Sequence, residues 1–495
     1  MFPVFPYERH TLRRDLSASL VVFLVALPLC VGVAVASGMP AEAGLVTGII
    51  GGLVVGALPG SSLQVSGPAA GLTVLVFEAV REYGPAGLGA IVLAAGLLQI
   101  TMGALKTGRW FRAISASVVH GMLGGIGVVL LVGQTYSLLG RSAPGGTLEG
   151  LTGLPGLLTG TVGEPVALAS AGIGIAVIAV MAVWRFVPGR LRMIPAPLAA
   201  VVLATGAAAL LPVKKIEVQG ILGVLRPPGP DELARLAELG VLGTVVAFTL
   251  IASAESLFSA AAVDRMHDGK RTDYDKELMA QGVGNTACGL LGALPMTAVI
   301  VRSAANVHAG ARTKASRILH GGWLLLFAAL LPAALGAIPV AALAGVLIHS
   351  GWKLVPKREL ARLWRTERGE ALVLTVTMAS IIATNLLEGV LVGLSLAVAK
   401  TAWDVSHVHV EVDEADEDAG TLRVRLAGNA TFLRLPRILD TLEALPPDRR
   451  VELDLSGLRH LDHACRNALR TWAAQRDGRG WEVKVSGDLS AVPAA

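Results

Sequence analysis

Long apolar runs alternate with short polar connections from Leu16 to about Thr401. Their lengths predict about fourteen membrane segments, in two sets of about seven separated by a polar stretch. The segments are expected to begin near Leu16, Gly44, Pro68, Gly87, Ile114, Pro165 and Pro195, and then near Val241, Glu277, Thr297, Ile318, Ile338, Ala371 and Leu387. Because the first run is long enough to span and many more follow, we interpret it as a transmembrane helix and not as a signal peptide.

Two of these segments are too short to cross a bilayer, which takes about 20 residues. One follows Pro68 in the stretch VSGPAAGL, and the other runs from about Thr297 to Ala309. Each is the third segment of its set. This coincidence predicts that the two sets are repeats of one another, each with a broken helix at the same place.

The basic residues indicate the topology. With the N-terminus inside, the inner loops hold about 22 Lys and Arg and the outer loops about 6, as the positive-inside rule requires. Because each set has an odd number of segments, the second set must enter from the opposite side. The sequence therefore predicts an α-helical polytopic membrane protein with a 7+7 inverted-repeat transporter fold. Residues 1–15 form a cytoplasmic N-terminus, repeat 1 covers about 16–212 and repeat 2 about 239–404.

After Asp404 the chain becomes polar. The stretches TLRVRLAG, VELDLSG and WEVKVSG alternate like strands, and helical patterns lie between them. This pattern predicts a small cytoplasmic α/β domain over residues 405–495.

Composition and charge exclude several classes of function. The chain is 53% hydrophobic and 16% charged, against about 25% charged for soluble domains. Its net charge of +5 is accounted for by loop Lys and Arg, so we expect no nucleic-acid partner. The three cysteines lie far apart without metal-ligand spacing, and we expect neither a metal nor a cofactor. No H-E-x-x-H motif or Ser/His/Asp set is found, which argues against an enzyme.

The short segments predict an anion site. A helix that begins at the membrane midplane leaves N–H groups without partners, and such an N-terminus attracts anions. In the first short segment Ser66 could cap the helix, while Ala69, Ala70 and Gly71 would offer free N–H donors. In the second, Arg302 lies early in the helix. The alternative is that both are glycine-kinked spans, with Arg302 at a loop edge.

A buried acid accompanies this site. Glu255 lies mid-span in FTLIASAESLF, where a carboxylate costs about 2.5 to 3.5 kcal/mol. A titratable group beside an anion site can couple a proton to transport. The alternative is a structural ion pair between Glu255 and Arg302, and the two roles are compatible.

Six stretches carry a resemblance to a known family: ALPLCVGVAVASG, VSGPAAGLT, ASAESLFSAAAVDRM, ELMAQGVGN, VRSAANVHAGARTKAS and ELDLSGLRHLDHA. Together they resemble the sulfate permease (SulP) family of anion transporters, near its bacterial dicarboxylate (fumarate-type) symporters. The resemblance implies a mobile core and a gate domain, a homodimer, and a C-terminal STAS domain similar to anti-sigma-factor antagonists. It also implies a multi-pass protein in the lipid of the bacterial inner membrane, with a cytoplasmic STAS domain.

The resemblance implies site residues as well, because in the family the anion lies between the third and tenth segments, near the first and eighth. Carried over, the implied residues are Ala69, Ala70, Val301 and Arg302, with Leu29 and Val33 on the first segment. Glu255 falls where coupled members carry an acid. Leu29 and Val301 replace polar residues of relatives, so backbone N–H groups must do more of the binding.

These observations predict a secondary active anion transporter that moves a proton with a small carboxylate or dicarboxylate, bicarbonate or sulfate. An uncoupled anion exchanger or channel is the close alternative. A membrane sensor that signals through its STAS domain is another. Ala464 stands where antagonists carry a phosphorylatable Ser or Thr, so we expect no phosphorylation switch there.

Overall fold

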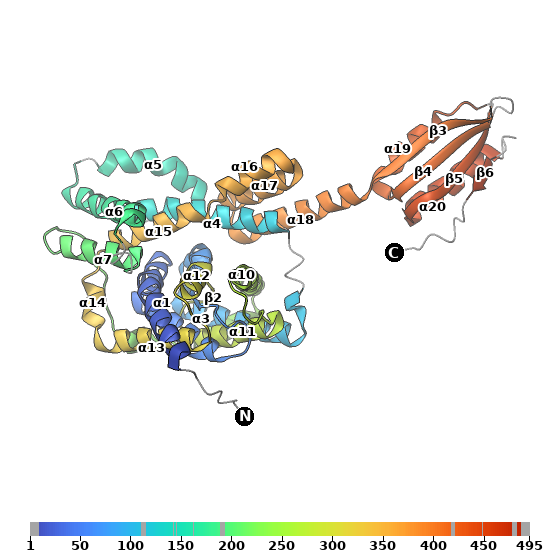
Figure 1. The fold of residues 1–495 in the computed structure, drawn as a ribbon. Coiled ribbons are helices and arrows are strands. Elements are labelled where there is room, and N and C mark those ends of the chain that lie inside the picture. Colours follow the sequence, from blue (N-terminus) through green and yellow to red (C-terminus); the bar gives the residue numbers. More distant parts are fainter. Residues whose placement is uncertain are drawn as a thin grey trace. The chain divides into compact units, whose positions relative to one another are not determined.

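The computed structural model of the chain describes residues 9–109, 115–141, 143–144, 146–161, 163–188, 194–416, 421–447, 449–477 and 483–486. It consists of two compact units, Met1–Leu394 and Ser395–Ala495, which are treated separately below (Figure 1). The expected segment start near Ile114 and the two chain ends at 1–8 and 487–495 lie outside the described residues.

The elements of the first unit follow the predicted order. Its first half contains α1 (Arg9–Ala36), α2 (Ala41–Ile50), a π-helical turn (Gly51–Val55), β1 (Ser66–Pro68), a 3-10 turn (Ala70–Leu72), α3 (Thr73–Ala104), α4 (Ala116–Leu138), α5 (Thr147–Thr161), α6 (Pro165–Val183) and α7 (Ala196–Ala207). Its second half contains α8 (Ile221–Val224), α9 (Pro230–Ala234), α10 (Leu239–Asp264), α11 (Tyr274–Leu291), β2 (Met296–Ala298), α12 (Ile300–His308), α13 (Ala315–Leu330), α14 (Pro332–Gly336), α15 (Val340–Leu354), α16 (Lys357–Thr366) and α17 (Arg368–Ala383). Helix α18 (Leu386–Val405) begins in this unit and continues beyond Leu394 into the second.

Helices are found at all the predicted segments. The third and fourth segments are merged in α3, which is broken at Gly84, where φ is 74°, immediately before Pro85. The tenth segment is the 9-residue helix α12. Among the described helices, five are long and apolar enough to cross a membrane as single helices. Helices α5 and α16 were not predicted from the sequence.

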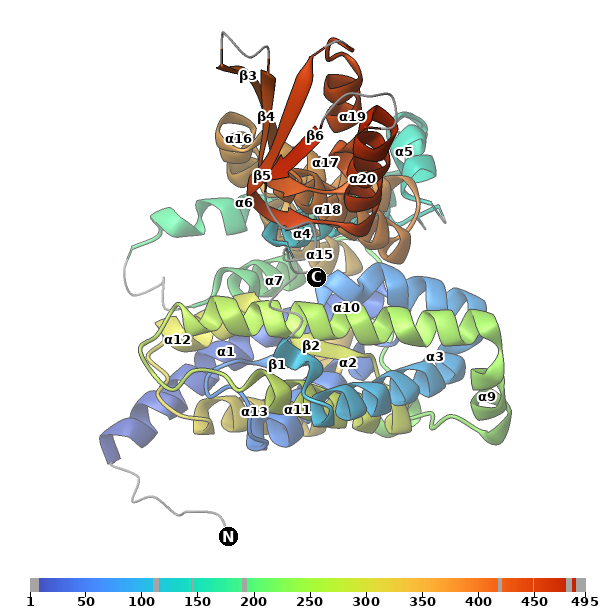
Figure 2. The same ribbon diagram turned by 90° about the vertical axis from the view of Figure 1, so that its right-hand side faces the viewer.

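The helices form two layers, which Figures 1 and 2 show from perpendicular directions. In one layer α3 packs along α11, α1 packs along α13, and β1 and β2 lie among these helices. In the other, α15 and α17 pack on α4, and α6 packs on α15. The first layer draws on the early segments of both repeats and the second on the late ones. This division matches the core and gate that the resemblance implies for a 7+7 inverted repeat.

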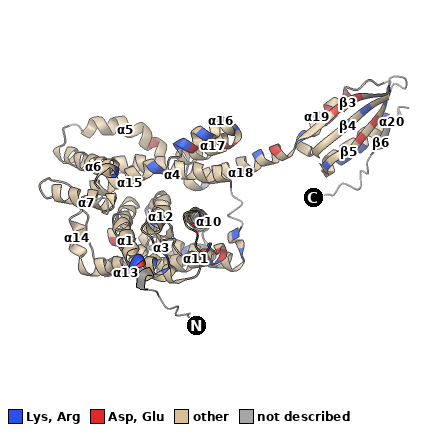
Figure 3. Cartoon of the chain, viewed as in Figure 1, with Lys and Arg blue, Asp and Glu red and all other residues tan. Residues whose placement is uncertain are grey.

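Charged side chains are sparse along the helices of the first unit (Figure 3). The interior also holds uncharged polar side chains, and Gln64, Gln99, Gln281 and Asn285 are among the buried ones. Buried amides are stable only when they are hydrogen-bonded. Gln281 bonds to Ser66 of β1 and Asn285 to Met296 of β2, while Gln64 and Gln99 bond to residues of the adjacent helices α10 and α11.

The second unit holds a four-stranded sheet of β3 (Val408–Asp416), β4 (Thr421–Ala430), β5 (Arg450–Leu461) and β6 (Val483–Ser486), in the order β3-β4-β5-β6. The β3–β4 pair is antiparallel and the other two pairs are parallel. Helices α19 (Leu435–Glu443) and α20 (His463–Asp477) complete its α/β fold. Apolar side chains alternate along β4 and β5 into one core, as their two-residue periodicity predicts.

Candidate functional site

The two repeats meet at a two-stranded antiparallel ladder. Ser66 pairs with Ala298, Gly67 with Thr297, and Pro68 with Met296. A helix begins just after each strand, and because the strands are antiparallel the two helices leave in opposite directions (Figure 2). Their N-termini therefore face each other across the ladder, which is the arrangement expected for two broken helices.

Both helix starts lack a side-chain cap. Ala69 precedes the 3-10 turn and Val299 precedes α12, and both have extended backbone. The first N–H groups of a helix have no partner inside the helix, so each start presents donors and a partial positive charge. The expectation that Ser66 caps the first helix is wrong. Ser66 lies within β1, and its hydroxyl accepts a hydrogen bond from Gln281 Nε2 at 2.7 Å.

Asn285 on α11 holds one strand of the ladder in place. Its Oδ1 accepts a hydrogen bond from Met296 N–H at 2.7 Å, and its Nδ2 donates to Met296 O at 3.1 Å. Nδ2 also donates to Gln99 Oε1 at 2.8 Å, and Gln99 Nε2 donates in turn to Ser253 Oγ. This one amide satisfies both backbone groups of Met296, so α11 fixes the position of β2.

Further polar contacts tie the strands to neighbouring helices of the core. Ser256 Oγ on α10 accepts from Ala298 N–H at 3.2 Å, and Ser303 Oγ on α12 accepts from Val65 N–H at 2.9 Å. Gln64 Nε2 donates to Ser256 O at 2.8 Å. Such contacts from three sides make the ladder a rigid support for the two helix starts.

Arg302, on α12 of the second repeat, bonds to β1 of the first repeat. Its side chain is buried, and Nη2 donates to Pro68 O at 3.1 Å. The guanidinium lies against Gly67, where a side chain would collide with it. Nε and Nη1 are buried without a hydrogen-bond partner among the described residues. The guanidinium therefore places a positive charge at the crossing point, and Arg302 does not lie at a loop edge.

Val301, by contrast, is 56% exposed. Consecutive residues of a helix point about 100° apart, so the two side chains occupy different faces of α12. Val301 accordingly faces outward from the core layer while Arg302 faces into it. The first turn of α12 therefore offers backbone N–H donors and the Arg302 guanidinium, but its exposed face carries no polar side chain.

Glu255 lies on α10 next to the first helix start. Both carboxylate oxygens are 2.8 Å from the position that a Cβ on Gly71 would occupy. Oε2 is buried without a hydrogen-bond partner, and Thr297 is the polar neighbour of the carboxylate. No ion pair joins Glu255 to Arg302 in the part of the chain that the structure describes. The alternative of a structural ion pair between them is therefore wrong.

The remaining expected residues are apolar and mostly buried. Ala69 is 2% exposed and Ala70 is partly exposed, so little of the first helix start is accessible from outside the protein. Val33 packs in the same cluster as Leu72 and Leu75 of that start. Leu29 belongs to a separate cluster with α6, α7 and α15. Val33 therefore lies closer to the half-helix than Leu29 does.

A cavity of about 390 Å³ lies between the core and gate layers. Its walls include the end of α1, the first turns of α3, and parts of α4, α5, α17 and α18. Thr73 lines it with a buried hydroxyl that has no hydrogen-bond partner, and Gln134 lines it from α4. Thr73 was not predicted from the sequence, although a hydroxyl residue directly after the PAAGL stretch could have indicated a polar group at the helix start. Thr73 connects the cavity to the first half-helix.

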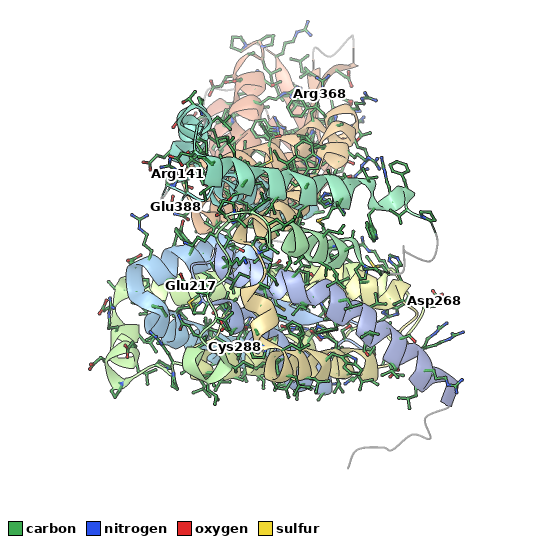
Figure 4. All side chains as sticks on the ribbon, turned by 90° about the vertical axis from the view of Figure 1, so that its left-hand side faces the viewer. Arg141, Glu217, Asp268, Cys288, Arg368 and Glu388 are labelled. Atoms are coloured by element: carbon green, nitrogen blue, oxygen red, sulfur yellow. The ribbon has the colours of Figure 1, made fainter. Side chains whose placement is uncertain are left out.

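One rim of this cavity is charged. Arg141 lines it beyond the end of α4 and pairs with Glu164 at 2.7 Å. Glu78 lines it from α3. In Figure 4 Arg141 and Glu388 lie in the gate layer, whereas Cys288 lies in the core layer. The cavity thus leads from a charged rim toward the uncharged first turn of the half-helix.

Two inverted repeats that cross through broken helices define a class of secondary membrane transporters. Residues 12–377 match the sequence profile of the sulfate permease family, and residues 414–494 match that of the Mlab, STAS domain. The chain belongs to the sulfate permease family and carries a C-terminal STAS domain. It is a membrane transporter and not an enzyme.

Its relatives include transporters with different stated substrates. The "Putative sulfate transporter YvdB" of Bacillus subtilis is 28% identical over 79% of this chain and 74% of its own length. The "Bicarbonate transporter BicA" of Picosynechococcus is 28% identical over 83% of this chain and 74% of its own length.

Solved structures share the fold. The transmembrane domain of a cyanobacterial bicarbonate transporter BicA superposes with a TM-score of 0.65 at 23% identity, covering 79% of this chain and 98% of that one. Murine Slc26a9, an anion transporter in an inward-facing state, superposes with a TM-score of 0.79 at 14% identity, covering 98% of this chain and 87% of that one.

Proposed function

We propose that this chain is a secondary active transporter that moves a small anion together with a proton by alternating access. The observation that carries the proposal is the crossing of β1 and β2, which brings two uncapped helix starts, the Arg302 guanidinium and the Glu255 carboxylate together. Oriented backbone donors and a buried cation attract an anion, and a nearby titratable group couples its binding to a proton.

The anion is held between the N–H groups of Ala69, Ala70 and Gly71 on one side and those that begin α12 on the other. Arg302 contributes charge from behind the ladder and orders Pro68 through its hydrogen bond. Because Val301, Ala69 and Leu29 offer no side-chain donor, recognition rests on backbone groups. A compact oxyanion fits such a site, which leaves bicarbonate, sulfate and small carboxylates or dicarboxylates as the candidate substrates.

Glu255 carries the proton. Its carboxylate lies against Gly71, so when it is ionised it repels an anion that approaches the same helix start. When it is protonated it is neutral and the anion binds. Anion and proton therefore bind together, and movement of the core layer against the gate layer exposes both to the other side of the membrane.

The location and assembly follow from the same proposal. The chain lies in the inner membrane of a bacterium as a homodimer, with its N-terminus and STAS domain in the cytoplasm. The distribution of basic residues supports the orientation, because the loops assigned to the inside hold most of the Lys and Arg.

Uptake by the full chain in proteoliposomes tests the function. Bicarbonate, sulfate and fumarate are offered in turn, with and without an imposed pH gradient. We expect one of them to accumulate when the outside is acidic. Glu255→Gln, which resembles the protonated acid, should still exchange that anion across the membrane but should lose accumulation driven by the gradient. Accumulation by this variant at the wild-type level would assign the chain to uncoupled exchange or to another proton route.

A further inference from the structure

Helix α16 is a short basic helix between the gate helices α15 and α17. Its sequence is KRELARLWRT, and it was not expected from the apolar pattern because it contains no apolar run. Between Lys353 and Arg368 the chain holds six basic and two acidic residues. Figure 3 shows basic side chains in blue on α16.

One face of α16 is packed against the gate. Leu363 is 5% exposed and clusters with Ala371 and Leu374 of α17, while Leu360 packs beside it. Glu359 pairs with Arg362 one turn later at 2.5 Å, which holds the pKa of Glu359 below its usual range. The packing of Leu360 and Leu363 on α17 fixes the orientation of the helix, and its remaining residues form a defined outer face.

The outer face combines basic groups with tryptophan. Lys357, Arg358 and Arg365 are exposed, and Arg368 follows at the start of α17. Trp352, at the end of α15 beside this face, is 60% exposed, and Trp364 on α16 is 54% exposed. Lys357 Nζ lies 2.7 Å from the centre of the Trp352 ring. Within the described residues, Arg358, Arg365 and Arg368 have no carboxylate partner.

Unpaired cations beside exposed tryptophan are typical of a segment that lies in the membrane interface. Tryptophan prefers the level of the lipid headgroups, and long basic side chains extend toward phosphate. Anionic lipids of the cytoplasmic leaflet attract such a segment by about 1 kcal/mol per Lys or Arg. The predicted topology places this loop on the cytoplasmic side, where those lipids are found.

We propose that the outer face of α16 binds the phosphate headgroups of anionic phospholipids in the cytoplasmic leaflet. Arg358, Arg365 and Arg368 bind the phosphates, and Trp352 and Trp364 rest at the headgroup level. Because α16 is packed on α17, the bound lipid holds the gate layer at a fixed depth while the core layer moves. This inference extends beyond the proposed function and does not depend on which anion is carried.

The test measures lipid selectivity of the full chain without reference to transport. The protein is reconstituted in phosphatidylcholine with trace spin-labelled phosphatidylglycerol or spin-labelled phosphatidylcholine, and the motionally restricted fraction of each label is measured by electron spin resonance. We expect wild type to prefer phosphatidylglycerol. In the triple variant Arg358→Gln, Arg365→Gln, Arg368→Gln the preference for phosphatidylglycerol over phosphatidylcholine should fall at least about threefold, because three headgroup contacts are removed.

A matched control removes the same charge from the second unit. Arg437, Arg459 and Arg470 are exposed, and their replacement by Gln should leave the preference unchanged. The wild-type preference should also fall at 1 M salt, where the screening length is about 3 Å. Equal preference in wild type and the α16 variant, with both proteins monodisperse, would overturn the proposal. So would an equal loss in the control variant, because the effect would then follow net charge alone.

Discussion

The carboxylate of Glu255 and the backbone of Gly71 are packed directly against each other, with both carboxylate oxygens 2.8 Å from the place of a Cβ on Gly71. Glu255 belongs to the first helix of the second repeat and Gly71 to the half-helix of the first. A proton on the carboxylate therefore changes the charge next to a helix start in the other repeat. In the proposed function, this contact lets the protonation of Glu255 affect anion binding at the helix start.

Gly71→Ala is expected to reduce anion uptake at least about tenfold. The added methyl group would lie 2.8 Å from the carboxylate oxygens, closer than a carbon tolerates, so Glu255 must move away from the helix start. Because only one methyl group is added at a single contact, we expect the protein to remain folded. Uptake in proteoliposomes and the melting temperature of the purified variant are the measurements.

Gly172→Ala is the matched control for this change. It adds the same methyl group to α6, where nothing lies within 4 Å of the new atom. Its uptake should match that of wild type. If Gly71→Ala also transports within twofold of wild type, the contact between Glu255 and the first half-helix has no role in transport.

Arg302→Met is expected to weaken anion binding about tenfold or more. Methionine keeps a flexible chain of similar length but removes the charge, and in a site that excludes water a single charge has a large effect on affinity. The variant also loses one hydrogen bond to Pro68 O, a cost of about 1.5 to 3 kcal/mol for a charged donor. Calorimetric titration of the purified protein gives the affinity. Arg265→Met, at an exposed position after α10, is the control, and equal affinity in all three proteins would remove Arg302 from the site.

Asn285→Ala should lower both stability and anion binding. It leaves Met296 N–H, Met296 O and Gln99 Oε1 without their partner, and each unsatisfied buried group costs about 1 to 3 kcal/mol. We expect a clear fall in melting temperature and a helix start that is no longer held in place. Thr152→Ala, which removes an exposed hydroxyl bonded to Leu148 O and Glu149 O within α5, should change stability by less than about 0.5 kcal/mol. A melting temperature for Asn285→Ala equal to this control would contradict the role of Asn285 at β2.

The STAS domain should lose stability in acid through Asp462. Burial alone would raise the pKa of this carboxyl, but hydrogen bonds from Cys465 and Phe432 N–H outweigh burial and hold the pKa below its ordinary value near 3.8. The stabilisation is therefore complete above that value and is lost as pH falls through the folded-state pKa. Asp462→Asn should cost about 1 kcal/mol at neutral pH, since it weakens the cap of α20, and the cost should shrink in acid.

Hydrogen exchange of the β4 and β5 amides in the full chain, between pH 3 and pH 7, follows this effect. The exposed Asp440→Asn is the control and should show no such pH dependence. A constant difference between Asp462→Asn and wild type across this range would mean that the charge of Asp462 does not contribute.

The apolar pattern predicted most helices of the first unit, including the short α12, but not α5. In lipid, segment length and loop charge are imposed by the bilayer, so they are visible in a single sequence. The ladder itself was not predicted, because SGP and MTA are three-residue strands whose pairing depends on contacts far along the chain. Helix α16 was missed for the opposite reason, since its position is set by charge and by two leucines and not by an apolar run.

The directions of individual side chains were the hardest to predict. A shift of one residue in the start of α12 would move Arg302 to the exposed position of Val301, because each residue advances the helix by about 100°. The sequence placed both near the site but could not assign one to the exposed face and the other to the interior. Serine is a residue type that often caps helices, but Ser66 lies within β1, before the helix start, and its hydroxyl bonds to Gln281.

The β1–β2 pairing also bears on how such a protein can arise by gene duplication. Ser66, Gly67 and Pro68 of one repeat pair with Ala298, Thr297 and Met296 of the other, so each repeat supplies half of one ladder. A lone seven-segment ancestor could not complete the ladder by itself. Two copies inserted in opposite orientations could, and fusion of the two would preserve it. After fusion, a substitution in either strand alters the support of both helix starts, so the two halves must change together at these positions while the surrounding helices diverge.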